Sequence, residues 1–327
     1  MATDTVFESM TGDVDNISKK MPELHWQHPY KQGFATVAQG RSQEPVNLYY
    51  EMHGNGPRKV LFIMGLNTPC QAWDFQTSEL APTGENTIVT FDARGVGWTD
   101  GTWDSYNTTE WAKDVLELLD HLGWASEVHA VGYSAGGQVL QKMLLLSPQR
   151  FKSIALVSTT AGGTRPFTGA YTLISNLFVS DPHEQLRRLM RINYTKSWLD
   201  QRPDDDSSVD TNFERVFKKQ LERNTRNRPQ QIGGMVSQAI ASMRHWVTAS
   251  DLAKIRSFGI PTLVATNTWD NFVHTSHSFY LRDHLQPDVF MVFEDTGHVI
   301  PTAKYKEFNS ALVQLWTKAE TPDLINN

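Results

Sequence analysis

Three residue types that act together in nucleophilic catalysis, a serine, an acid and a histidine, each follow a predicted strand. Ser134 lies at the centre of the segment GYSAG, residues 132–136. A short apolar strand at residues 128–131 precedes this segment, and a helical run at residues 138–146 follows it. Strand, G-x-S-x-G and helix form the context of a nucleophile elbow, where a sharp turn exposes the serine hydroxyl at the end of a sheet. The pattern therefore predicts that Ser134 is a nucleophile.

A serine hydroxyl at neutral pH needs a base to take its proton and a carboxylate to orient that base. Asp270 follows the apolar strand predicted at residues 262–265, and His298 follows the strand predicted at residues 289–293. Ligands bind beyond the carboxyl ends of the strands in open α/β sheets, so all three residues can meet at one edge. The spacing predicts that His298 is the base and that Asp270 orients it.

Two other carboxylates compete with Asp270 for the role of the acid. Glu294 and Asp295 lie close to His298 in the sequence, and one of them could replace Asp270. Both flank the same loop as His298, however, and would have to fold back onto the imidazole. Asp270 is therefore the predicted acid.

Four further histidines lie in segments that could reach the site. We expect His274, His277 and His284, on or beside the helix after Asp270, to cap or pack, although His274 could also line the pocket. His245 lies on a predicted helix at residues 230–246. We expect it to be a partly exposed helix residue, with a position pointing into the site as the alternative.

The oxyanion that forms during attack on a carbonyl needs two preorganised N–H donors. One should be the N–H of Ala135, the residue after the serine. The second should come from Leu66, in the turn after the strand at residues 59–64, where Gly65 gives the backbone room. We expect a mostly apolar substrate pocket, and the predicted substrate-binding residues are Gly65, Tyr133, Met235, Met243, Trp246 and Phe272.

The elements that must position these residues are eight predicted strands alternating in large part with helices. Alternation of buried strands with amphipathic helices indicates a mostly parallel sheet with helices on both faces. The fold class is therefore α/β. The strands are expected at residues 33–39, 47–53, 59–64, 87–91, 128–131, 153–157, 262–265 and 289–293.

The alternation is interrupted between residues 161 and 250, where the pattern contains no convincing strand. Three amphipathic helices, at residues 183–194, 212–223 and 230–246, suit this stretch better. We therefore predict an N-terminal extension at residues 1–30, a core formed by residues 31–160 and 251–320, and a helical lid at residues 161–250.

The composition of the chain excludes some classes of partner and any intrachain disulfide. The chain has 327 residues, 39% of them hydrophobic, and a formal net charge of −6, which argues against nucleic acid or an anionic membrane as the main partner. One basic cluster, Arg223, Arg226 and Arg228, is expected to be a solvated helix end. The single cysteine, Cys70, allows no intrachain disulfide and is expected to pack.

The ends of the chain carry no recognisable targeting signal, and no stretch approaches the roughly 20 apolar residues that would span a bilayer. These features predict a soluble, cytoplasmic protein with a small-molecule substrate. Exposed apolar residues in the lid leave a homodimer open. No metal or cofactor is expected.

At these residues the sequence resembles the α/β-hydrolase-fold serine hydrolases, over about residues 33–318. The resemblance is carried by FIMGL with Trp73, FDARGVG, GYSAG and Gly297-His298. It is most similar to an esterase-like group with Met-Gly at the oxyanion turn, near enol-lactonase-like and methylesterase-like proteins. Many relatives have His-Gly where this chain has Met64-Gly65, and the acid loop lacks a glycine found in many of them. The serine also counts against epoxide hydrolases and haloalkane dehalogenases, which use an aspartate nucleophile.

The resemblance and the residues together predict a serine hydrolase. Its substrate would be an ester, thioester or lactone of a small, largely apolar molecule, cleaved through an acyl-enzyme on Ser134. Two alternatives remain open. A carbon–carbon bond hydrolase of the same fold would use the same three residue types, and a small-molecule receptor could retain the elbow for binding.

Overall fold

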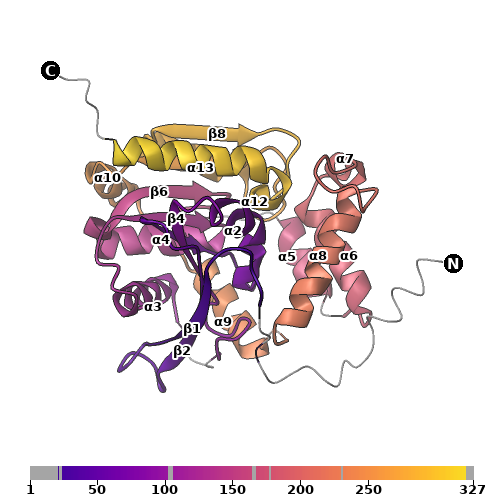
Figure 1. Ribbon diagram of the computed structural model, residues 1–327, viewed down its shortest axis with the longest axis horizontal. Helices are drawn as coiled ribbons and strands as arrows, with labels where there is room; N and C mark the ends of the chain where they lie inside the picture. The colour runs from indigo at the N-terminus through magenta and orange to yellow at the C-terminus, as the bar shows by residue number, and fades with distance from the viewer. Residues whose placement is uncertain are drawn as a thin grey trace.

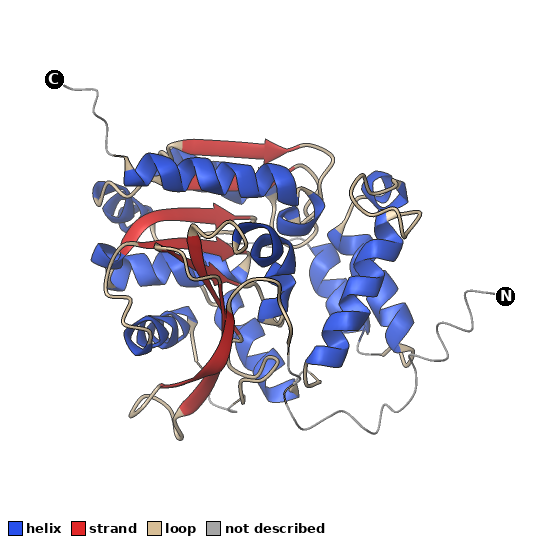
Figure 2. Ribbon diagram, in the orientation of Figure 1, coloured by secondary structure: helices blue, strands red, loops and turns tan. Residues whose placement is uncertain are grey.

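The computed structural model describes residues 21, 24–101, 106–163, 167–176, 178–229 and 231–321. The predicted N-terminal extension, residues 1–30, lies largely outside the described residues. The described part of the chain forms a layered α/β structure in which helices cover both faces of a sheet (Figure 2).

One eight-stranded sheet forms the centre of the molecule, in the order β1-β2-β4-β3-β5-β6-β7-β8. Strands β1 and β2 form an antiparallel pair, β2 is antiparallel to β4, and all the other neighbouring strands are parallel. The prediction of a mostly parallel α/β sheet is confirmed. The strands are β1 Tyr30–Val37, β2 Val46–His53, β3 Arg58–Ile63, β4 Asn86–Phe91, β5 Val128–Tyr133, β6 Phe151–Val157, β7 Thr262–Asn267 and β8 Val289–Phe293.

Helices pack on the two faces of the sheet because each carries an apolar stripe and each central strand is apolar on both faces. Residues of α3, α4, α10 and α11 join one apolar cluster, and residues of α2 and α13 join the other. These helices and the short turns beside them are η2 Cys70–Trp73, α2 Asp74–Leu80, α3 Thr108–His121, α4 Ala135–Leu146, η3 Pro148–Arg150, α10 Ala249–Ser257, α11 Thr275–Leu285, α12 Ile300–Ala303 and α13 Tyr305–Glu320.

Between β6 and α10, the described part of the chain has five helices, where three were predicted. They are α5 Phe167–Asn176, α6 Pro182–Asn193, α7 Lys196–Asp200, α8 Asn212–Arg226 and α9 Ile232–Met243. Helices α5 to α8 stand together beyond the arrowheads of the parallel strands (Figure 1). They therefore lie at the carboxyl edge of the sheet, where the three candidate catalytic residues were expected.

The prediction that the arginine cluster at the end of α8 is a solvated helix end is wrong. Arg223 is only 8% exposed, and its guanidinium donates to Gln220. Arg226 pairs with Asp74 at 2.6 Å. The cluster therefore belongs to the contact between α8 and the core.

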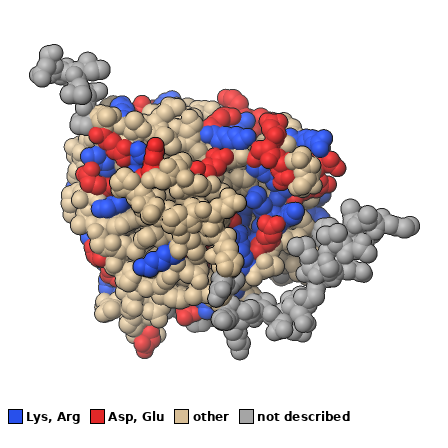
Figure 3. All heavy atoms as spheres, viewed as in Figure 1, with Lys and Arg blue, Asp and Glu red and all other residues tan. Residues whose placement is uncertain are grey.

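Acidic and basic side chains are interspersed on the face drawn in Figure 3. Among the described residues, no helix is both long enough and apolar enough to cross a membrane.

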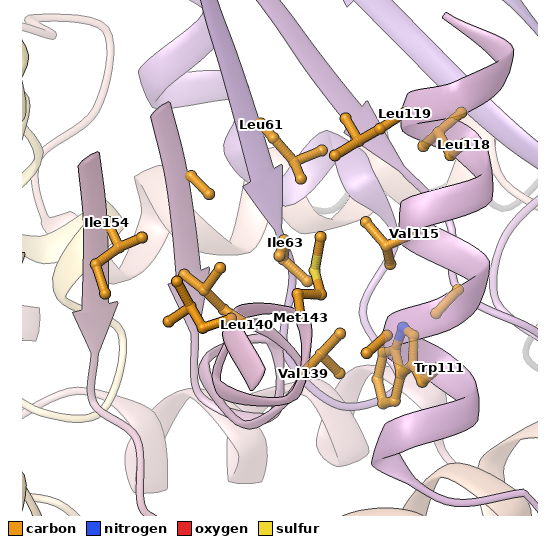
Figure 4. Close-up of a cluster of buried hydrophobic side chains, with 14 of the residues drawn as sticks. Leu61, Ile63, Trp111, Val115, Leu118, Leu119, Val139, Leu140, Met143 and Ile154 are labelled. Atoms are coloured by element: carbon orange, nitrogen blue, oxygen red, sulfur yellow. The ribbon is translucent and has the colours of Figure 1, made fainter. Parts of the chain in front are cut away.

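Leu61 of β3 tests the packing of the core, because it lies fully buried between the sheet and α3 near Leu119 (Figure 4). Truncation to alanine removes buried methyl groups and leaves a cavity that the neighbours fill only in part. We expect Leu61→Ala to lower the free energy of unfolding by about 2–5 kcal/mol. Chemical denaturation measures this. Leu146→Ala, at a position 45% exposed, should change it by less than about 0.5 kcal/mol. Equal effects of the two variants would contradict the packing argument.

Candidate active site

Ser134 occupies a tight turn between β5 and α4. Its backbone has φ 55° and ψ −120°, a strained conformation for a residue other than glycine. The turn is held from several sides, because the Ser134 N–H donates to the Val157 carbonyl at 2.9 Å and the Ser134 carbonyl accepts from Gly137 N–H at 3.0 Å. A Cβ atom on Gly136 would lie 2.1 Å from the carbonyl oxygen of Ile63. This glycine is therefore needed for α4 to begin so close to β3.

The structure brings Ser134, His298 and Asp270 into one hydrogen-bonded chain. His298 Nε2 lies 3.0 Å from Ser134 Oγ, and His298 Nδ1 lies 2.8 Å from Asp270 Oδ2. An ionised carboxylate only accepts hydrogen bonds, so Nδ1 carries the proton toward Asp270. The lone pair of Nε2 then faces the serine hydroxyl, as a general base requires.

Asp270 is held as a carboxylate by four donors. Its Oδ1 accepts the N–H groups of Phe272 and Val273, both at 2.8 Å, and its Oδ2 accepts from Asn267 Nδ2 at 3.1 Å as well as from His298. Burial by itself would raise the pKa of Asp270, but His298 and the two backbone N–H groups outweigh it and hold the pKa below its usual value. Asp270 therefore stays charged beside the imidazole.

Leu66 and Ala135 were predicted to supply the two N–H groups of an oxyanion site. Within the described part of the chain, the N–H groups of Leu66 and Ala135 donate to no other residue. Ala135 is the first residue of α4, so its N–H also lies at the positive end of a helix. A Cβ atom on Gly65 would lie 3.1 Å from Ser134 Cβ, which places the turn carrying Leu66 directly against the serine.

A sequence model of a family described as the alpha/beta hydrolase fold matches residues 59–302. The matched range is well over half of the chain and includes Ser134, Asp270 and His298. The chain belongs to this family.

Individual relatives of this α/β hydrolase match only part of the chain. The mitochondrial palmitoyl-protein thioesterase of Mus musculus is 25% identical over 149 residues, which are 45% of this chain and 50% of that protein. The chain spans about half the length of the first curated relatives it matches. Sequence similarity thus supports the family and leaves the substrate open.

Solved structures of related proteins cover nearly the whole chain. A thermophilic esterase from Thermogutta terrifontis has a TM-score of 0.69 at 20% identity, covering 89% of this chain and 100% of that one. Est816, described as an N-acyl homoserine lactone degrading enzyme, has a TM-score of 0.62 at 25% identity, covering 82% and 96%. The first of these likenesses shows the fold alone.

Aromatic rings surround the imidazole of this α/β hydrolase. The ring centroids of Tyr133 and Phe272 each lie 5.2 Å from that of His298. Burial raises the pKa of the Tyr133 hydroxyl well above its ordinary value, so Tyr133 is an apolar wall and not a second base. The substrate-binding roles of Gly65, Tyr133 and Phe272 stay predictions.

The other predicted substrate-binding residues lie on or after α9. Met235 is half-buried, whereas Met243 and Trp246 are 66% and 62% exposed. Trp246 borders a surface hollow of about 340 Å³ together with Lys142 and Arg244, and none of the three candidate catalytic residues borders it. Their roles in substrate binding stay predictions.

Asp295, His277 and His284 have other partners in the structure, and the Glu294 side chain is exposed. Both carboxylate oxygens of Asp295 accept from Ser197 Oγ, at 2.7 and 2.6 Å. His277 Nδ1 lies 3.0 Å from Thr160 Oγ1, and His284 Nδ1 lies 2.9 Å from the Tyr280 carbonyl. These side chains therefore take part in packing and turn contacts, as we expected for the two histidines.

His245 differs from its prediction as a partly exposed helix residue. It is buried, it lies after the end of α9, and its Nδ1 is 2.9 Å from Thr108 Oγ1. His245 therefore connects the end of α9 to the start of α3.

Two functional candidates were missed in the sequence. Asn267 is the last residue of β7 and donates to Asp270, and Gln238 of α9 contacts the turn that carries Leu66. The acid loop Asn267-Thr268-Trp269-Asp270 contained the first signal, since it departs from the glycine of many relatives. The segment Ser237-Gln238-Ala239 resembled the esterase-like group, but nothing in the sequence indicated the contact of Gln238 with Asn67, which is 171 residues away.

No metal centre is evident at the site. Within the described ranges, no group of three or more His, Cys, Asp or Glu side chains is arranged to hold a metal ion. The chemistry that these residues can perform is nucleophilic attack by Ser134 with His298 as the base.

Proposed function

We propose that this protein is a serine hydrolase that cleaves an ester, thioester or lactone through an acyl-enzyme on Ser134. The observation that carries the proposal is the chain of hydrogen bonds from Ser134 Oγ through His298 to Asp270, next to two free N–H groups. Membership of the α/β hydrolase family supports hydrolysis as the reaction class.

The geometry suits a two-step reaction. His298 takes the Ser134 proton as the hydroxyl oxygen attacks the carbonyl carbon, and Leu66 and Ala135 N–H groups stabilise the oxyanion. His298⁺ then gives the proton to the leaving oxygen or sulfur. A water molecule, deprotonated by His298, then attacks the carbonyl carbon of the acyl-enzyme. The carboxylic acid is released, and Ser134 regains its proton from His298. Asp270 stabilises the imidazolium formed in each step.

The surroundings favour a small, largely apolar substrate. Tyr133 and Phe272 flank the imidazole, and helices α5 to α9 form the lid in this proposal. The relatives named as a thioesterase and a lactone-degrading enzyme act on acyl carbonyl compounds, which agrees with this class.

Substrate profiling tests the reaction class. The full-length protein is assayed with p-nitrophenyl esters and acyl thioesters of increasing acyl length, with N-acyl homoserine lactones and with β-diketones. We expect turnover of at least one carbonyl ester, thioester or lactone class, and none of the β-diketones. Faster cleavage of the β-diketones would favour the carbon–carbon hydrolase. Tight binding of an ester with turnover far below about 1 per second would favour a receptor.

A further inference from the structure

A single side chain of α9, Gln238, connects this helix to the turn that carries Leu66. Gln238 is fully buried, and both ends of its amide are engaged. Its Oε1 accepts the Asn67 N–H at 2.8 Å, and its Nε2 donates to the Arg94 carbonyl at 2.9 Å. Because one partner is a donor and the other an acceptor, the amide has one satisfied orientation.

The Asn67 N–H belongs to the peptide plane next to the one that carries the Leu66 N–H. Only φ and ψ of Leu66 separate these two planes, so fixing one restricts the direction of the other. Asn67 itself has φ +53°, in the left-handed region that costs energy for a residue other than glycine. Its own Oδ1 is buried and has no hydrogen-bond partner among the described residues. The turn therefore depends on Gln238 for this backbone contact.

The same helix also contacts the element that supplies the other oxyanion donor. Ser242 Oγ of α9 donates to Gln138 Oε1 at 2.8 Å, and Gln138 lies in the first turn of α4, which begins with Ala135. A Cβ atom on Gly234 would lie 2.5 Å from Gly95 Cα, so α9 sits against the core at backbone distance. One face of α9 is thus docked beside both halves of the oxyanion site.

We infer that Gln238 is a positioning residue for the Leu66 N–H of the proposed oxyanion site. With α9 docked, the amide holds the Leu66–Asn67 peptide plane so that the Leu66 N–H faces the carbonyl oxygen of the substrate. The inference rests on the proposed serine hydrolase function.

The test compares Q238M with Q231M on the best ester substrate found by profiling. Gln231 Oε1 accepts the Gly101 N–H at 3.0 Å and so links α9 to the core without touching the Leu66 turn. One oxyanion donor is worth about 10²–10³ in kcat, and a displaced donor should cost part of this. We expect Q238M to lower kcat by about 10- to 100-fold with KM changed less than about threefold, and Q231M to change either by less than about threefold.

A trifluoromethyl ketone separates an oxyanion effect from a general loss of structure. It forms a tetrahedral adduct with an oxyanion on the active serine, whereas the carboxylic acid product does not. Q238M should lower the affinity for the ketone by the same factor by which it lowers kcat/KM. It should leave inhibition by the carboxylic acid product unchanged. Q238E, which keeps an acceptor for the Asn67 N–H, should recover part of the ketone affinity.

The inference is overturned if folded Q238M keeps kcat and ketone affinity within about threefold of the wild type. It is also overturned if Q231M loses both to the same extent as Q238M. Q238N, whose side chain is one methylene too short to reach both partners, replaces Q238M if that variant does not fold, with the same expectation. Failure of the proposed function itself is distinguishable, because the wild type would then turn over no ester and form no ketone adduct.

Discussion

Ser134→Ala is expected to lower turnover by about 10⁴- to 10⁶-fold while the protein keeps its fold. The hydroxyl is the nucleophile in the proposed mechanism, and its removal leaves only oxyanion stabilisation and binding. The fold should persist because the turn at Ser134 is held by backbone bonds to Val157 and Gly137, which alanine also makes. Steady-state kinetics and circular dichroism of both proteins measure the two effects.

Labelling with a fluorophosphonate probe, followed by peptide mass mapping, locates the activated serine. The probe should modify Ser134 in the wild type, and the label should disappear in Ser134→Ala. Ser310→Ala, on the exposed part of α13, is the matched control and should keep both labelling and turnover. Wild-type turnover by Ser134→Ala would rule out the mechanism. Absence of labelling in a well-folded wild type would instead favour the alternative that the protein is a small-molecule receptor without hydrolase activity.

The sheet could be predicted because its strands are nearly all apolar and short. Buried parallel strands exclude most polar residues from both faces, so β5 and β7 stand out from their neighbours. The edge strand Val289–Phe293 is also apolar, and its bounds were predicted correctly. Topology then makes the ends of β5, β7 and β8 lie at one edge. For this reason the positions of Ser134, Asp270 and His298 followed from local patterns.

Helices of the inserted segment were harder to predict. Helix α5, Phe167–Asn176, has no charged residue and contains Gly169, so it lacks the polar face that marks an amphipathic helix. Helix α7, Lys196–Asp200, has five residues and is shorter than two turns. Their formation depends on tertiary contacts, such as the close approach of Gly169 to the Asn271 carbonyl.

Contacts between segments far apart in the sequence could not be predicted at all. Arg223 sits in a polar, basic stretch that suits a solvated helix end, and only the packing of α8 on the core buries it. Gln238 lies within a run of apolar and small residues, and its role depends on a turn near residue 67. A local pattern carries information on burial and periodicity, but none on which distant group will accept or donate a hydrogen bond.

Asp270→Asn is the second variant with a large expected effect, because it changes the proton position on His298. The amide can still accept from Phe272 and Val273 N–H through its oxygen, but its NH₂ group would then face His298 Nδ1. Nδ1 must then accept, so the proton moves to Nε2 and faces the Ser134 hydroxyl. The base lone pair is lost, and kcat should fall by about 10⁴-fold.

Asp295→Asn and Glu294→Gln are the matched controls, since these carboxylates were the competing candidates for the acid. Asp295 accepts from Ser197, and the Glu294 side chain is exposed. Each control variant should therefore keep kcat within about threefold of the wild type, with all melting temperatures measured in parallel. A loss at Asp295 or Glu294 comparable to that at Asp270 would transfer the role of the acid to that residue. A rate for Asp270→Asn close to that of the wild type would mean that His298 keeps its productive tautomer without this carboxylate, against the geometry of the site.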